Sequence, residues 1–511
     1  MLSPIALGCS SVATGLANVA KSRFPTAGLT CMLPSLLAGA SLGVPATRLA
    51  KRWLPSPERR RCRGPPLEPE GSVVAPSKTI DPIELSSRLI DTGVADEQVV
   101  RVNSALSEID DNVAVIEAFS NMVAFGTDDG LVCFDASGPF SGAAVMDSLR
   151  GWSADRVNTL LYTHGHIDHV GGSGALAADA VERGQPLPDV VGHDNVVPRF
   201  ERYNATNGYN LIINRRQFGI GLRQRGVGIA FDDDHFLPSD ALWPNRTFST
   251  QDSLSVGGLD FELHHDKGET DDHTWAWVPS HRAICPGDLV AWVFPNAGNP
   301  QKVQRYPLEW ARALRQMDSL EPELLIPAHG PPVRGRERIG TVLLSLVEAL
   351  EALVSQTIEL MNSGASLDEI LQTVSLPAEW LSRPWMRPVY DEPEFVIRNI
   401  WRQYGGWWDL DPSNLKPSPR AELADELVRM GGGAAAFATR AQELVEAGDL
   451  KLACHLIELA VAADPASTSL HGVRAEIYEA RRTAEQGLMS IGIFSAAAAE
   501  SREIAEHREG D

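Results

Sequence analysis

A stretch of six residues concentrates side chains that bind metals. His164, His166, Asp168 and His169 lie in the segment THGHIDHVGG, which ends in two glycines. Imidazole nitrogen and carboxylate oxygen are donors that suit zinc, and two nearby sets of three donors would hold two ions rather than one. Two zinc ions lower the pKa of a shared water toward neutrality, so the segment predicts a metal-assisted hydrolytic centre.

A predicted strand and the loop after it position these donors. The apolar segment RVNTLLY precedes the motif directly and is typical of a strand that runs into a loop. His164 and His166 are two residues apart at its end, so their imidazoles can point to one side. Gly171 and Gly172 are expected to let the backbone turn sharply beside the site.

The periodicity of the chain changes once after this motif. Residues 76–342 alternate strand patterns, such as NVAVIEAFSNMVAFGTDDGLVCFDASG with its DDG turn, with helical patterns such as AAVMDSLRGWS. This alternation predicts a layered α/β domain. Apolar residues then recur every three or four positions over residues 343–505, which predicts an all-α domain. Its tail resembles about two helical-hairpin repeats, too few to stand alone, so a second copy of the chain is a plausible partner.

Composition excludes several classes of partner. The net charge is −22, and because the first 75 residues are basic, the rest carries about −28. So acidic a body is a poor candidate for binding nucleic acid or an anionic membrane. The six cysteines include no CxxC pair, so they predict neither a disulfide framework nor a thiolate zinc site.

The first 75 residues have the character of a leader. No acidic residue occurs before Glu58, and Ser, Ala, Leu and Arg are common. This composition is typical of a cleaved organellar targeting segment, for a mitochondrion or plastid; export to a periplasm is the alternative, and a disordered tail is another. The apolar run TCMLPSLLAGASLGVPA is shorter than the roughly 20 residues of a membrane span, so we expect no stable membrane insertion.

The HxHxDH pattern followed by glycines resembles the metallo-β-lactamase superfamily. The resemblance implies an αββα sandwich with a dinuclear site, two Zn²⁺ per chain, on loops at one edge. It also implies three later ligands: Glu269, the bridging carboxylate Asp288 in PGD, and His329 in IPAHGPP. Asp168 and Asp288 are the residues expected to take part directly in catalysis.

The position of Glu269 separates the branches of this superfamily. A histidine is usual there, and His264, His265 and His273 are all nearby. His273 would shorten the run to Asp288 and would lack the preceding glycine, so we favour Glu269 and keep His273 as the alternative. A glutamate at this place is characteristic, by resemblance, of alkylsulfatases.

A second segment resembles alkylsulfatases independently. IWRQYGGWWDLDPSNLKPSPRAELADELVRMGGG is similar to the start of the alkylsulfatase dimerisation domain. The resemblance implies a homodimer formed through residues 343–505 and a small anionic ester as substrate. Arg305 corresponds to an arginine near the sulfate, although a surface arginine is an equal interpretation, and Tyr203, Tyr209 and Tyr404 are further candidates for substrate contact.

One departure from the alkylsulfatase pattern leaves other functions open. The segment VYDEPEFVIRN stands where the family has a histidine, and Asp391, Glu392 and Glu394 would repel a sulfate if they faced the pocket. A thioesterase or lactonase of glyoxalase type is therefore one alternative. A non-catalytic dimeric scaffold is another, but a scaffold has no chemical need for a bridging carboxylate.

Overall fold

The structure is a computed structural model that describes residues 80–223 and 235–507. The predicted leader, residues 1–75, lies outside the described residues. The described residues form one compact unit.

The first sheet has seven strands in sequence order. Its first four strands pair antiparallel, and the last four pair parallel. The strands are β1 (Leu106–Asp110), β2 (Val113–Ile116), β3 (Met122–Thr127), β4 (Gly130–Phe134), β5 (Val157–Leu161), β6 (Asp189–His193) and β7 (Arg246–Phe248).

The second sheet has six strands and reverses the chain order, from β13 at one edge to β8 at the other. All neighbours pair antiparallel except β11 and β12. The strands are β8 (Gln251–Val256), β9 (Leu259–His265), β10 (Thr274–Val278), β11 (Ala283–Cys285), β12 (Leu324–Leu325) and β13 (Val333–Arg334).

The two sheets pack face to face, with helices on both outer faces. Along β10, Ala276 and Val278 join the cluster between the sheets, while Trp275 and Trp277 point outward into a helical layer. This alternation follows the two-residue period of a strand, and here both faces are apolar because both are covered. The layers confirm the predicted αββα sandwich.

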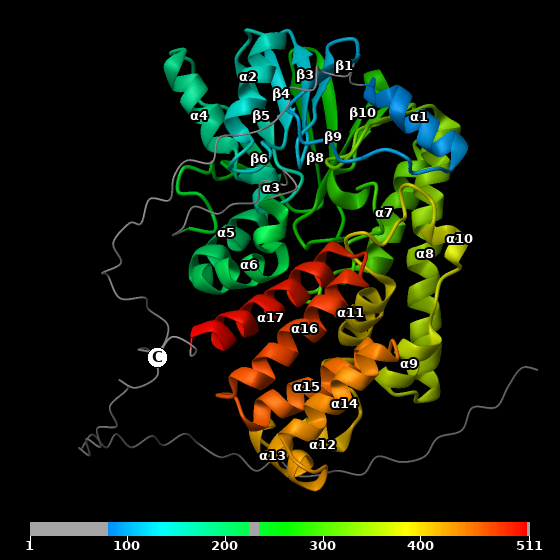
Figure 1. Ribbon diagram of the computed structural model, residues 1–511. Helices are drawn as coiled ribbons and strands as arrows, with labels where there is room; N and C mark the ends of the chain where they lie inside the picture. Colours follow the sequence, from blue (N-terminus) through cyan, green and yellow to red (C-terminus); the bar gives the residue numbers. More distant parts are fainter. Residues whose placement is uncertain (1–79, 224–234, 508–511) are drawn as a thin grey trace, which may run out of the picture. The chain divides into compact units, whose positions relative to one another are not determined.

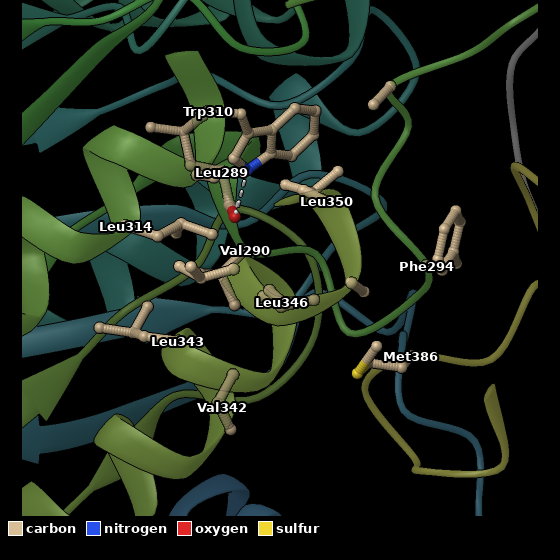
Figure 2. Close-up of a cluster of buried hydrophobic side chains, with 14 of the residues drawn as sticks. Leu289, Val290, Phe294, Trp310, Leu314, Val342, Leu343, Leu346, Leu350 and Met386 are labelled. Atoms are coloured by element: carbon tan, nitrogen blue, oxygen red, sulfur yellow. Dashed lines mark hydrogen bonds between the residues drawn. The ribbon is translucent and has the colours of Figure 1, made fainter. Parts of the chain in front are cut away.

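Helices form the outer layers (Figure 1). The first sheet is covered by α2 (Gly142–Trp152), α4 (Ser173–Glu182) and α5 (Val196–Ala205), and the second by α1 (Pro82–Thr92), α7 (Pro307–Ser319) and α8 (Arg336–Ser363). Figure 2 shows α7 and α8 meeting at Trp310, whose indole donates to the Leu289 carbonyl at 2.9 Å. The predicted boundary between residues 342 and 343 falls inside α8.

The helix α8 also has the length and composition of a membrane span. Among the described residues it is the one helix with this property, and 61% of its apolar window is buried inside the molecule. Such burial is typical of a core helix.

The rest of the described chain is helical, as predicted. The helices are α9 (Leu367–Thr373), α10 (Ala378–Leu381), α11 (Pro393–Gly405), α12 (Pro412–Leu415), α13 (Arg420–Met430), α14 (Ala434–Glu446), α15 (Leu450–Ala463), α16 (Thr468–Thr483) and α17 (Leu488–His507). A small core rich in alanine holds α14, α15 and α16 together.

The last helix returns to the sandwich domain. In Figure 1, α17 lies beside α6 (Asn207–Arg223), and the two helices pack closely. A Cβ atom on Gly492 would lie 1.7 Å from the carbonyl oxygen of Gln217, so this crossing requires glycine. The Leu488 amide also donates to the Val389 carbonyl at 2.9 Å. The helical region therefore contacts the loops and helices around the metal motif.

Candidate metal centre

The metal motif begins where β5 ends, and a buried carboxylate anchors it. Asp135 follows β4 with φ +58°, a conformation that aspartate tolerates better than most residues. Its two oxygens accept from the backbone amide and the hydroxyl of Thr163, both at 2.8 Å. The same carboxylate lies 2.7 Å from Nδ1 of His169, which fixes that ring with Nε2 turned the other way.

Close packing explains the glycines after the motif. The short helix α3 (Ile167–Val170) carries Asp168 and His169. Gly172 has an ordinary φ of −83°, but a Cβ atom there would lie 2.1 Å from the Ala136 carbonyl oxygen. The backbone does turn at Gly171 and Gly172, as expected, but glycine is needed at position 172 for close contact rather than for an unusual φ.

The donors gather in two groups with a carboxylate between them. His164, His166 and Asp288 form one group, and Asp168, His169 and His329 form the other. Oδ2 of Asp288 lies 3.7 Å from His164 Nε2. Oδ1 of the same carboxylate lies 3.3 Å from both His169 Nε2 and His329 Nε2. Each oxygen of Asp288 thus faces a different group, the arrangement that a bridging ligand needs.

Both Glu269 and His273 lie next to the first group, but only Glu269 directs a carboxylate oxygen at one of its donors. Oε1 of Glu269 is 3.3 Å from Nδ1 of His166. His273 instead stacks on the His164 ring with centroids 5.1 Å apart, and its Nε2 accepts from the Asp288 amide at 3.1 Å. That nitrogen is therefore occupied by the backbone. The geometry favours Glu269 over His273 as a further donor.

The side chains of the two groups fit metal ions. Burial lowers the pKa of His164 and of His166, so both rings are neutral and able to donate a lone pair. Among the described residues, His169 Nε2 and Asp288 Oδ1 are buried without a hydrogen-bond partner. Unpartnered buried donors and acceptors are costly, and cations bound between them would remove this cost.

The buried acid groups fit metal ions as well. Burial, against the opposing charge of Arg305 and together with the neighbouring Asp288 carboxylate, raises the pKa of Glu269 to about 8. Asp168 lies in the second donor group nearby. Positive charge between these three carboxylates would allow all of them to stay ionised.

A cavity of about 410 Å³ opens over the two groups. His166, Asp168, Glu269, Asp288 and His329 form part of its wall. Much of the remaining lining is apolar and comes from distant segments: Val100, Val102, Phe119, Ile213, Phe218, Phe236, Val293, Val303, Val389 and Leu488. The cavity therefore joins a polar part, which contains the candidate metal ligands, to an apolar part.

Three of the four predicted substrate contacts line this cavity. Arg305 is buried, which excludes the surface interpretation, and its Nη1 lies 3.2 Å from Oε1 of Glu269. Tyr203 is buried against the Phe236 ring at 4.9 Å, whereas Tyr209 is largely exposed at the cavity wall. Tyr404, at the end of α11, is half exposed and lies outside the lining.

Comparison with known proteins places these features in a family. Residues 115–329 match the model of the metallo-beta-lactamase superfamily, and residues 366–504 match that of the alkyl sulfatase dimerisation domain. The chain is an alkylsulfatase-like member of the metallo-β-lactamase superfamily. Together the two matches cover more than half of its 511 residues.

Similar proteins include several alkylsulfatases. The linear primary-alkylsulfatase of Pseudomonas sp. (strain ATCC 19151) is 26% identical over 337 residues, 63% of this chain and 62% of that protein. The alkyl/aryl-sulfatase BDS1 of Saccharomyces cerevisiae is 25% identical over 424 residues, 78% of this chain and 64% of that one. The chain thus spans about 60% of the length of these curated relatives.

A solved structure shares the fold. The inverting sec-alkylsulfatase Pisa1 from Pseudomonas sp. superposes with a TM-score of 0.69 at 23% identity, over 78% of this chain and 66% of that one. Two matched domains in the same order support the αββα sandwich followed by a helical dimerisation domain.

The acidic segment at the start of α11 turns away from the cavity of this metallo-β-lactamase domain. Asp391 is buried, and its Oδ2 accepts from the amides of Gly298 and Asn299 at 2.6 and 3.2 Å. Glu392 accepts from Ser490 of α17 at 2.6 Å, and Glu394 pairs with Arg398. None of these three side chains lines the cavity, so their charges do not face an anion bound there.

Two cavity residues were missed by the sequence analysis. Asn296 donates to Oε1 of Glu269 at 2.5 Å, and Lys302 lies half buried in the lining. Both belong to the segment between the 3₁₀ turn Gly287–Leu289 and α7, which contains no helix or strand. Its length was the one signal in the sequence, since long loops without regular structure commonly carry function.

Proposed function

We propose that this protein is a metal-dependent hydrolase that cleaves alkyl sulfate esters to an alcohol and inorganic sulfate. The observation that carries the proposal is Asp288, which faces two donor groups at one side of a cavity whose other lining is largely apolar. A substrate with an anionic head and an apolar tail matches this combination of surfaces. The names of the similar proteins support the same class of substrate.

The proposed metal ligands are the seven side chains described above, and zinc is the proposed metal. His164, His166 and Glu269 would hold one ion, and Asp168, His169 and His329 the other, with Asp288 shared. When bound, zinc supplies Lewis acidity and lowers the pKa of water toward neutrality. The protein contributes the orientation of the donors, chiefly through Asp135 behind His169.

Arg305 would bind the sulfate group. Its Nη1 is held by Glu269, but its Nε is buried and has no hydrogen-bond partner among the described residues. A buried guanidinium with a free N–H is suited to an oxyanion, because such charge-assisted hydrogen bonds are strong in a dry site. The apolar lining would hold the alkyl chain and exclude water from the reacting bond.

We also propose that the dimerisation domain joins two copies of the chain. Its surface exposes large apolar side chains that a partner could cover, among them Trp407, Leu423 and Met430. Light scattering coupled to size-exclusion chromatography should give twice the chain mass. A chain mass that stays single at all concentrations would contradict the proposal.

The proposed reaction is tested by sulfate release from decyl sulfate, with the metal content of the same sample measured. We expect about two zinc ions per chain and release of sulfate, both reduced in Glu269→Ala. Glu446→Ala, at an exposed carboxylate on α14, is the matched control and should behave as the wild type. Binding of two metals without sulfate release would exclude the sulfatase, and thioesters and lactones would be tried next.

A further inference from the structure

The cations of the cavity wall differ in how far their charge is neutralised. The charge of Arg199 is neutralised, because its guanidinium forms ion pairs with Asp271 and Asp272, each at 2.5 Å. Arg305 is partly neutralised by Glu269 at 3.2 Å. Lys302 and Arg202 have no carboxylate within ion-pair distance among the residues that the structure describes.

Lys302 is the better placed of these two unpaired cations. Its Nζ donates to Oδ1 of Asn214 on α6 at 2.9 Å and lies 6.0 Å from the centre of the Phe236 ring. Asn214 is itself fixed, since its amide donates to the Asn210 carbonyl at 2.8 Å. By contrast, Arg202 lies over the Tyr203 ring on α5.

The surroundings of Lys302 combine a polar anchor with an apolar surface. An ammonium group has three N–H donors, and Asn214 accepts from one of them. The other two have no carboxylate to bind among the described residues, while Phe236 offers apolar surface at the same point of the wall. A head group with acceptor oxygens, joined to an alkyl chain, would satisfy both.

We propose that Lys302 recognises the monoanionic head group of the substrate and thereby sets the preference for charged over neutral alkyl compounds. This inference rests on the proposed function, because it assigns a residue to the same cavity. Lys302 binds the head group from the α6 side, while Arg305 binds it beside the metal groups. Lys302 is a binding residue here and takes no part in bond cleavage.

The charge on Lys302 depends on pH near neutrality. Burial, together with the positive charge of Arg305, lowers the pKa of Lys302 to about 7, although Asp168 and Glu269 oppose this shift. A bound anion favours the protonated form, so binding of an anion takes up a proton above this pH. Affinity for the anion should then fall as the pH rises from about 7 to about 8.5.

The test uses 1-decanesulfonate, a monoanion at every pH used that has no ester bond to cleave, and neutral 1-decanol. Calorimetric titration of the zinc-loaded full chain measures both. We expect Lys302→Met to weaken sulfonate binding about 10- to 100-fold, because one charged hydrogen bond is lost. Binding of decanol should be unchanged. Lys302→Arg should bind sulfonate with little dependence on pH. Lys451→Met, an exposed lysine on α15, is the matched control.

Each outcome decides the proposal. Equal sulfonate binding by wild type and Lys302→Met overturns it but leaves the sulfatase activity standing. A loss in Arg202→Met without a loss in Lys302→Met also overturns it and assigns the head group to Arg202. No sulfonate binding by the wild type removes the inference and, together with absent sulfate release, the proposed function as well.

Discussion

The metal groups and the apolar wall of the cavity are built in contrasting ways. Several metal donors are fixed from behind by buried hydrogen bonds from loops at strand ends, as His169 is by Asp135 and His329 by the Phe119 carbonyl. Part of the apolar wall comes from two helices, at Ile213 and Phe218 of α6 and Leu488 of α17, and α17 packs against α6 in close contact at Gly492. The contrast teaches that chemistry and substrate selection are separable in this molecule. Changes behind the donors should remove metal, whereas changes at the helices should alter chain preference with metal retained.

The largest effect is expected at the carboxylate between the two groups. Asp288→Asn replaces one of two equivalent oxygens with an NH₂ group, which donates and cannot bind a cation. Sulfate release should fall by about 10³-fold or more, with zinc lost from the purified protein. Activity within about tenfold of the wild type would show that Asp288 does not bridge the groups.

A smaller loss is expected one step behind the donors. Asp135→Asn keeps the left-handed backbone conformation but weakens the hold on the His169 ring. Zinc affinity should fall about 10- to 100-fold, measured by competition with a chromogenic chelator. Asp155→Asn, in an exposed turn, is the matched control. An unchanged zinc affinity would show that Asp135 is not needed to orient the His169 ring.

The same contrast explains what the sequence could predict. The first donors lie within six residues, so their spacing alone indicates a metal site. The later ones, Glu269, Asp288 and His329, needed the family resemblance because they are far away in the chain. The αββα layers and the helical domain also follow from periodicity and resemblance.

Residues brought to the site by tertiary packing could not be predicted. Lys302 meets Asn214 only because α6 lies against the loop before α7. Asp135 supports His169 across two neighbouring parallel strands, and no local pattern marks it. Tyr404 is the converse case: it was predicted to contact the substrate because of its motif, but it lies in the helical region, outside the cavity lining.

The contribution of the helices to the cavity wall is tested where α17 crosses α6. The Cβ added by Gly492→Ala would lie 1.7 Å from a backbone oxygen, so α17 must shift, and Leu488 at its start must move with it. We expect the free energy of unfolding to fall by about 1–3 kcal/mol, measured in urea. The ratio of KM values for decyl and hexyl sulfate should also change, while zinc content stays at the wild-type level.

A matched glycine controls for the substitution itself. Gly472 lies in α16, and a Cβ atom added there would meet no other atom within 4 Å. Gly472→Ala should therefore leave both measurements near wild type or raise stability slightly, because alanine favours a helix over glycine. Loss of zinc from Gly492→Ala would contradict the separation of the two regions.

An effect confined to one pH range is expected at Asp391, which connects the metal donors with the helical region. Asp391 lies just before α11, and it accepts hydrogen bonds from the amides of Gly298 and Asn299. The same loop contains Asn296, which donates to Glu269. Burial raises its pKa to about 7, even though three backbone amides and Arg305 favour the carboxylate. A carboxyl group whose folded pKa is raised binds more protons in the folded state than in the unfolded chain. Its contribution to stability is therefore complete below the unfolded value near 4 and is lost as the pH rises through about 7.

The amide of the Asp391→Asn variant does not titrate, so comparison of the wild type with this variant isolates the contribution. Between about pH 5 and pH 8 the free energy of unfolding of the wild type should fall relative to that of the variant by about 2–3 kcal/mol, measured in urea at both values. A difference that is the same at both pH values would show that Asp391 is ionised throughout. In that case the charged carboxylate, rather than a protonated one, joins the helical domain to the loop beside the metal groups.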